Sequence, residues 1–253
     1  MNFQDTQLIG VLARADASLN QLSGLLQGLV DRFALHDAPL YLVGGSVRDA
    51  LLGRLGNDLD FTTPARPDVV YSILEEWAET VWDTGIDYGT VSAAYKGQQI
   101  EITTFRSDSY DGDSRNPEVI YGDTLEGDLV RRDFTVNAMA IELRPDGTRE
   151  FHDPMGGLQH LADRVLDTPD APEISFHDDP LRMLRAARFA AQVEFDVAKR
   201  VRDAMTDMAG EIQRITVERV QVELNKLICG TAPWKGIDLL LSLIHISEPT
   251  RLR

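Results

Sequence analysis

The feature that most constrains this chain is a pair of aspartates, Asp58 and Asp60, spaced two residues apart. They lie at the start of Asp58–Thr63, where alternate residues are expected to project to the same face, as in a β-strand. On a strand, residues i and i+2 project to one face, so Asp58 and Asp60 point the same way. Like charges held close together are costly unless a cation lies between them. Paired oxygen ligands suit Mg²⁺. Taken alone the pattern is weak, since a solvated turn at Asn57–Asp58 would explain it equally well.

The segment just upstream has the pattern of a strand, a glycine turn and a helix. The apolar run Leu40–Val43 enters Gly44–Gly45, and we expect Ser46 to cap a helix that ends at Gly53. Glycines let a backbone approach phosphate closely, and a helix N-terminus offers unpaired N–H groups. Arg48, one turn into the helix, adds a cation suited to bidentate phosphate contact. A plain strand-to-helix turn is the alternative.

Glu101 lies between two isoleucines in a further expected strand, Gln99–Phe105. A carboxylate in that position is usually the solvent-facing member of an alternating strand. It becomes a third acid beside Asp58 and Asp60 only if its strand neighbours theirs.

The remaining pattern predicts α+β structure first and helices afterwards, with the change near residues 165–175. Helical spacing of leucines over 7–36 indicates one or two amphipathic helices, and residues 106–129, rich in Asp, Gly and Ser, are expected to form a loop. The other expected elements are a helix at Asp68–Thr80, a hairpin of Val91–Tyr95 with Gln99–Phe105, a helix at Arg131–Met139, a strand at Ala138–Leu143, a turn at 153–157, and helices from Leu181, at Val197–Met208 and at Val217–Ile228.

Composition excludes several classes of protein. The 253 residues suffice for one large or two modest domains. A single cysteine, Cys229, excludes an internal disulfide framework and a Cys-rich zinc module. The longest apolar-rich run, residues 237–246, is about half of the roughly 20 residues that a membrane-spanning helix needs. Because the N-terminus also lacks the pattern of a signal peptide, we expect a cytoplasmic protein without membrane association.

The net charge of −16 argues against a polyanionic partner, but the distribution of charged residues along the chain does not. Residues 1–129 hold 8 basic and 21 acidic residues, or −13, whereas residues 130–253 hold 17 and 20, or −3. Within the second part, residues 180–202 hold six basic and two acidic residues. A nucleic-acid partner therefore stays open.

Together these segments resemble a known family. Residues 42–54 and 58–63 are similar to the polymerase-beta-type nucleotidyltransferase head of CCA-adding tRNA nucleotidyltransferases and bacterial poly(A) polymerases. Arg131–Met139, Asp178–Arg188 and Val217–Lys226 resemble the family's later motifs, in family order. The resemblance implies an α+β head with a mixed sheet and flanking helices, followed by an all-α neck.

The resemblance also implies roles for particular residues. Asp58 and Asp60 would hold Mg²⁺, with Glu101 as the third catalytic carboxylate. Gly44, Gly45 and Arg48 would contact the nucleotide's triphosphate. The other nucleotide-binding residues implied are Arg132, Asp133 and Asn137 around the sugar and phosphates, Asp179 and Arg182 at the base edge, and Arg185 and Arg188 at the triphosphate.

The implied reaction is the template-independent addition of CMP, CMP and AMP from CTP and ATP to the 3′ end of tRNA. A poly(A) polymerase, and a nucleotide-binding head without turnover of tRNA, are the alternatives. The templating motif begins Asp178–Asp179, where the family usually has Glu-Asp. The expected domains are a helical extension at 1–36, the head at 37–165, and a neck with the start of a body domain at 166–241. Residues 242–253 do not resemble the family, and we expect them to be a non-native tail.

Overall fold

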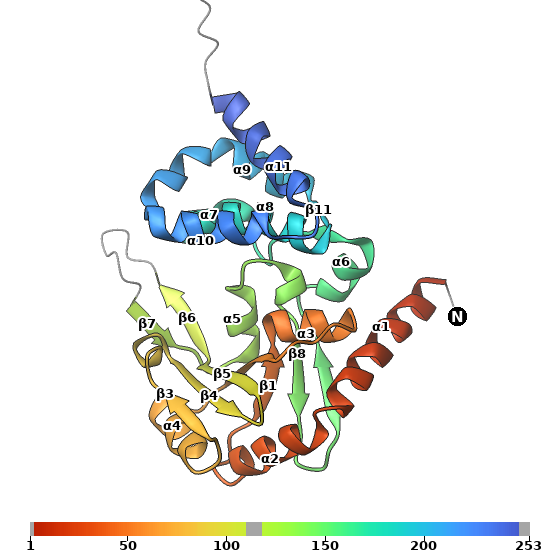
Figure 1. Ribbon diagram of the computed structural model, residues 1–253, viewed down its shortest axis with the longest axis vertical. Helices are drawn as coiled ribbons and strands as arrows, with labels where there is room; N and C mark the ends of the chain where they lie inside the picture. The colour runs from red at the N-terminus through yellow and green to blue at the C-terminus, as the bar shows by residue number, and fades with distance from the viewer. Residues whose placement is uncertain (1–2, 110–117, 248–253) are drawn as a thin grey trace, which may run out of the picture. The chain divides into compact units, whose positions relative to one another are not determined.

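The computed structural model describes residues 3–109 and 118–247 (Figure 1). Within them the chain divides into two compact units. The first, called the head unit, comprises residues up to 132 and 136–159, and the second, called the helical unit, comprises residues 133–135 and those from 160 onward. The predicted domain bounds stay a prediction.

A mixed sheet is the framework of the head unit. Among the described residues it has seven strands in the order β3-β4-β5-β2-β1-β8-β9. Its central pair, β2 and β5, is parallel, and the other neighbouring pairs are antiparallel. The strands are β1 (Leu40–Val43), β2 (Asp58–Thr63), β3 (Thr80–Trp82), β4 (Thr90–Tyr95), β5 (Gln98–Thr104), β8 (Ala140–Leu143) and β9 (Arg149–His152).

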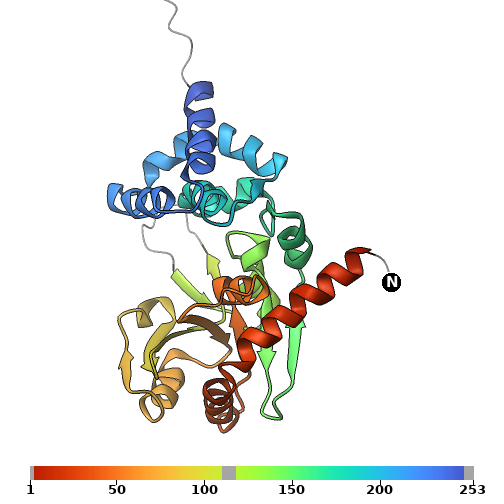
Figure 2. The same ribbon diagram turned by 45° about the vertical axis from the view of Figure 1, so that its right-hand side comes forward.

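Helices flank this sheet, as the sequence predicted. The segment 7–36 forms two of them, α1 (Phe3–Asn20) and α2 (Ser23–Ala34). Figure 2 shows α1, which packs on α3 (Gly44–Leu51) and is tied to β9 because Arg149 donates to Asn20 Oδ1 at 3.0 Å. The hairpin of β4 and β5 is confirmed, and it turns at Lys96 and Gly97, both with positive φ.

The helix after the glycine pair begins earlier than predicted. Its first residue is Gly44, and Ser46 lies inside it, so the predicted Ser46 cap is wrong. The Ser46 hydroxyl instead accepts from the Asp60 backbone N–H at 2.8 Å and donates to the Asp58 carbonyl at 3.2 Å. These two bonds tie the start of α3 to β2. The helix ends as expected, with Gly53 in the left-handed region.

Two other local predictions are wrong, and a third is right in part. The expected helix at Asp68–Thr80 is present as α4 (Pro67–Glu75), but it ends at Glu75 and β3 begins at Thr80. The expected loop at 106–129 holds β6 (Arg106–Ser109), β7 (Glu118–Tyr121) and α5 (Leu125–Val130), while its residues 110–117 lie outside the described residues. The expected helix at Arg131–Met139 is a turn and one 3₁₀ turn at Thr135–Asn137. Arg131 and Arg132 pair with Asp128 of the preceding helix, and the chain turns at Asp133, whose carboxylate accepts from the Phe134 backbone N–H.

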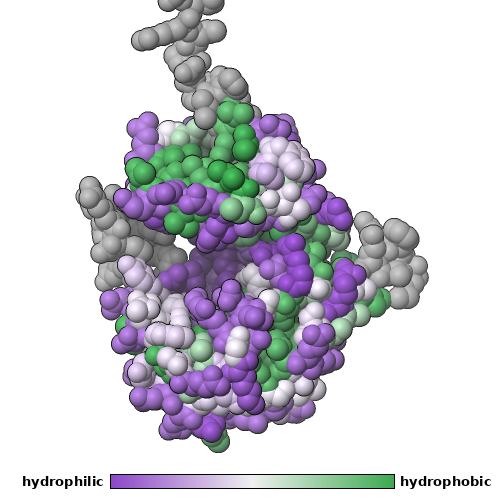
Figure 3. All heavy atoms as spheres, viewed as in Figure 1, coloured by the Kyte–Doolittle hydropathy of each residue, from purple (hydrophilic) through white to green (hydrophobic). Residues whose placement is uncertain are grey.

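The second unit is helical, with a two-residue parallel pair, β10 (Val165–Leu166) and β11 (Asp196–Val197), that the sequence did not predict. Within it, α8 packs against α10 and α11, and apolar surface gathers along α11 (green in Figure 3). The helices are α6 (Gly157–Asp163), which begins in the head unit, α7 (Pro172–Asp178), α8 (Leu181–Val193), α9 (Lys199–Asp207), a 3₁₀ segment (Ala209–Arg214), α10 (Val217–Ile228) and α11 (Pro233–Ser247).

The predicted fold class is confirmed, because a mixed sheet with flanking helices precedes a helical region. None of the described helices is both long enough and apolar enough to span a membrane.

Candidate active site

Three predicted acids come together on the central parallel strand pair. The register of β2 and β5 pairs Asp58 with Gln99 and Asp60 with Glu101. Ile100 and Ile102 are fully buried, whereas Glu101, between them, is only partly buried. The condition set for Glu101 as a third acid, that its strand neighbour that of Asp58 and Asp60, is therefore met.

The electrostatics of this group favour a cation. The pKa of Asp60 is raised to about 6, first by burial and then by the Glu101 and Asp58 carboxylates, whose effect exceeds the opposing effect of the Arg132 and Arg48 guanidinium groups. A cation placed among these three carboxyl groups would stabilise the ionised form of Asp60 and reduce the repulsion between the carboxylates. The oxygen-only donor set fits a hard divalent ion.

The glycine pair at the start of α3 lies directly beside Asp60. Gly44 has φ +66°, and a Cβ at this position would lie 2.9 Å from Arg132 Nη1 and 3.7 Å from Asp60 Oδ2. A Cβ at Gly45 would lie 3.5 Å from Arg48 Nη2 and 3.8 Å from Asp60 Oδ2. A backbone turn, two arginines and a carboxylate are thus within one small region of the head unit.

Arg48 is held almost buried, with 10% of its side chain exposed. Its Nη1 donates to Asn137 Oδ1 at 2.7 Å, while Nε and Nη2 donate to the Asp49 carboxylate at 3.0 and 2.9 Å. Asn137, predicted to touch the nucleotide, therefore contacts Arg48. The predicted residues of the head unit, Gly44, Gly45, Arg48, Asp58, Asp60, Glu101, Arg132 and Asn137, thus form a connected group.

Arg132 is fixed by a residue that the sequence reasoning missed. Asp128, whose side chain is fully buried, pairs with Arg131 and with Arg132. The spacing of three and four residues is a recognised signal of helical ion pairs, and it indicates a helix where the polar composition of residues 106–129 predicts a loop.

In the helical unit, Asp133 and Arg185 form an ion pair. The Asp133 carboxylate accepts from Arg185 Nε at 2.8 Å and from Nη2 at 2.5 Å, and it also accepts from the Phe134 backbone N–H. This carboxylate raises the pKa of Arg185. Arg188, expected at the triphosphate, is 10% exposed in its side chain and pairs with the buried Glu223 of α10 at 2.7 Å.

Asp179 and Arg182, predicted to read the base, lie at the junction of α7 and α8. Asp179 Oδ1 accepts from the Leu181 backbone N–H at 3.1 Å, and Oδ2 accepts from Arg219 Nη2 at 2.9 Å. Arg182 donates to Ser175 Oγ at 2.8 Å. Arg219 and Glu223, one turn apart on α10, were not singled out from the sequence, although both lie in a segment that resembled a family motif.

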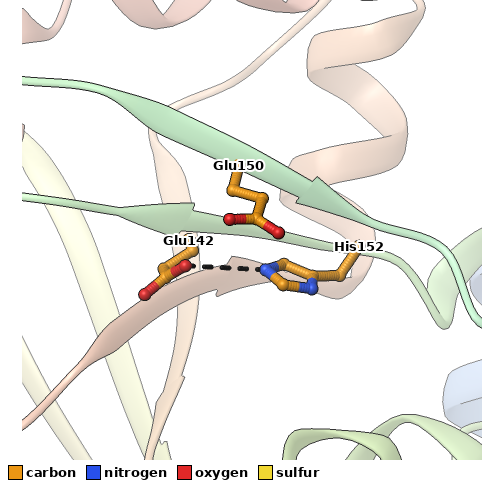
Figure 4. A group of neighbouring side chains, drawn as sticks. All are labelled: Glu142, Glu150 and His152. Atoms are coloured by element: carbon orange, nitrogen blue, oxygen red, sulfur yellow. Dashed lines mark ion pairs between the residues drawn. The ribbon is translucent and has the colours of Figure 1, made fainter.

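A second group could hold a metal ion by its geometry. Glu142, Glu150 and His152, on β8 and β9, bring ligand atoms within 4.8 Å of one another (Figure 4). Arg144 pairs with both glutamates and so already neutralises much of their charge. Asp58, Asp60 and Glu101 do not bring three ligand atoms so close. Mg²⁺, however, commonly takes one or two carboxylates and completes its shell with water and substrate oxygens.

Comparisons with known proteins match both parts of the chain. Residues 40–167 match the family described as "Poly A polymerase head domain", and residues 194–243 match "Probable RNA and SrmB- binding site of polymerase A".

Similar proteins are named CCA-adding enzymes. That of Levilactobacillus brevis is 44% identical over 203 residues, covering 80% of this chain and 49% of the relative. That of Bacillus pumilus is 40% identical over 208 residues, covering 82% and 50%. The crystal structure of the Bacillus stearothermophilus CCA-adding enzyme in complex with CTP matches with a TM-score of 0.74 and 36% identity, covering 85% of this chain and 51% of that one.

This chain spans about half the length of these relatives. The head-domain match nevertheless extends over the strands that carry the three acids and over the glycine turn beside them. The chain belongs to the poly A polymerase head-domain family, with a polymerase-beta-like nucleotidyltransferase fold.

Proposed function

We propose that this chain carries the nucleotidyltransferase site of a CCA-adding enzyme, which adds CMP, CMP and AMP from CTP and ATP to the 3′ end of tRNA. The observation that carries the proposal is the pairing of Asp60 with Glu101 across β2 and β5, next to the Gly44–Gly45 turn. The names of the relatives support the choice of reaction. A cytoplasmic location, expected from the sequence, belongs to the same proposal.

Asp58, Asp60 and Glu101 are the residues that would hold Mg²⁺. When bound, the ion would activate the attacking hydroxyl and neutralise charge on the leaving pyrophosphate. In the reaction, the 3′-hydroxyl oxygen of tRNA bonds to the α-phosphorus, the bond to pyrophosphate breaks, and the hydroxyl proton passes to solvent.

The other residues of the head unit bind and orient the nucleotide. The Gly44–Gly45 backbone offers N–H groups at a helix start, where the helix dipole favours phosphate. Arg48 and Arg132 lie beside that turn and supply positive charge. In the helical unit, Asp179 and Arg182 provide an acceptor and donors suited to the polar edge of cytosine or adenine, and Asp133, with Arg185 bound to it, offers an acceptor for a ribose hydroxyl.

Incubation with tRNA that lacks its CCA end, in the presence of MgCl₂ and of both CTP and ATP, one of which is labelled, tests this function. We expect two CMP residues and then one AMP. Incorporation of AMP alone, in runs, would favour poly(A) polymerase, the activity named in the description of the family. Nucleotide binding with no incorporation would favour a head that lacks tRNA turnover, which the half-length coverage of the relatives makes a specific alternative.

A further inference from the structure

The carboxylate of Asp128 has no access to solvent, although it lies two residues before the end of the short helix α5. Its side chain is 0% exposed. The next residue, Leu129, belongs to an apolar cluster with Val43, Ala138 and Ala140. A buried carboxylate is costly unless it is paired, so its retention here needs partners that compensate.

Both oxygens of Asp128 have arginine partners. Oδ1 accepts from Arg131 Nε at 3.1 Å and from Nη2 at 2.7 Å, and Oδ2 accepts from Arg132 Nη2 at 3.0 Å. Burial raises the pKa of Asp128, but the charges of Arg132 and Arg131, together with their hydrogen bonds, outweigh burial and hold this pKa below its ordinary value. Asp128 is therefore an ionised carboxylate that forms ion pairs with two arginines.

Arg132 has nitrogens that do not contact Asp128, and one of them lies close to the proposed site. Arg132 Nη1 lies 2.9 Å from the place that a Cβ on Gly44 would take, beside the turn and Asp60. Arg132 Nε is buried and has no hydrogen-bond partner within the described part of the chain. Asp128 thus binds Nη2 of the Arg132 guanidinium, while Nη1 faces the glycine turn.

We infer that Asp128 is a positioning residue for nucleotide binding: it fixes the Arg132 guanidinium so that Nη1 faces the triphosphate position at the Gly44–Gly45 turn. The inference rests on the proposed function. An arginine side chain has several rotatable bonds, and a fork anchored at one end loses less freedom when it binds an anion at the other. Because CTP and ATP carry the same triphosphate, Asp128 acts equally on both.

Titration calorimetry of the full chain with CTP and with ATP, in MgCl₂, tests the inference. We expect Asp128→Asn to lower the affinity for each nucleotide by about tenfold, which is the effect of losing about one charge-assisted hydrogen bond. Arg131→Gln is the matched control, because it breaks the other half of the Asp128 pairing and leaves the bond to Arg132. We expect it to change both affinities less than twofold.

A double-mutant cycle separates positioning from general stability. If Asp128 acts through Arg132, Asp128→Asn has no further effect on either affinity in an Arg132→Gln background. Equal losses for Asp128→Asn and Arg131→Gln, or the same tenfold loss with Arg132 already replaced, would overturn the inference. So would a folded Asp128→Asn chain that binds like the wild type.

If Asp128→Asn does not fold, Asp128→Glu replaces it in the same cycle. This variant keeps the charge and displaces it by one methylene, so we expect weaker binding of both nucleotides only while Arg132 is present. A wild-type chain that binds neither CTP nor ATP would refute the proposed function itself. A wild-type chain that binds both, with an Asp128→Glu variant that is folded and binds equally well, would refute the inference alone.

Discussion

Removing the charge of Asp60 should stabilise the metal-free protein while destroying its proposed function. Asp60 lies in the register position beside Glu101, and burial together with its acidic neighbours raises its pKa from 3.8 to about 6. Such a carboxyl favours its protonated form in the folded state, so its ionisation at neutral pH opposes folding. An asparagine has the same shape and carries no charge.

The magnitude follows from the pKa. A rise from 3.8 to about 6 corresponds to about 3 kcal/mol of free energy of unfolding, fully expressed once the pH is above the folded-state pKa. Because the side chain is partly exposed, solvent screens some of this, and we expect Asp60→Asn to gain about 1–3 kcal/mol at about pH 8. The gain should fall as the pH drops through 6 towards 3.8, reaching roughly half at about pH 5.

Urea unfolding in EDTA, followed by circular dichroism at both pH values, is the assay. Asp58→Asn is a matched control on the same strand, with an exposed side chain and therefore a smaller expected gain. Adding MgCl₂ should stabilise the wild type and narrow its difference from Asp60→Asn. A variant that is less stable than the wild type at about pH 8, or a gain that does not change with pH, would refute the reasoning.

Two further substitutions probe the elements around the site. Gly44→Ala places a side chain at φ +66° against Arg132, so we expect a loss of about 1–2 kcal/mol in urea unfolding and weaker CTP binding. Gly45→Ala is its control, since the nearest neighbour of its Cβ lies at 3.5 Å, and equal effects at both positions would contradict the geometry. Glu223→Gln leaves the nearly buried Arg188 without its anionic partner, and we expect a cost of about 3 kcal/mol and a lower Tm by calorimetry. An unchanged Tm would show that this pair contributes nothing to stability.

Local patterns sufficed for the elements that carry the acids and the glycine turn. Alternation placed β2 at Asp58–Thr63 as predicted, and helical periodicity placed α10 at Val217–Ile228. The pairing of Asp60 with Glu101 depends on strand order, which is set by packing across the whole sheet. The sequence alone could therefore state only the condition under which Glu101 would join the site.

The predictions failed where side chains override local propensity. Polar composition suggested a loop at 106–129, yet Thr124 caps α5 by accepting from the Gly127 backbone N–H, and Asp128 then draws two arginines back onto that helix. The chain turns at Asp133, whose carboxylate accepts from the next backbone N–H. Apolar spacing carries none of this information, whereas the cap and the spacing of Asp128 from Arg132 do.

Electron paramagnetic resonance of Mn²⁺ in the presence of CTP tests whether the acids of β2 and β5, and not the group on β8 and β9, hold the catalytic cation. Mn²⁺ shares the preference of Mg²⁺ for carboxylate oxygens. We predict that Asp60→Asn abolishes tight Mn²⁺ binding and that Glu150→Gln leaves it unchanged. Loss of binding in Glu150→Gln, with binding retained in Asp60→Asn, would contradict the account.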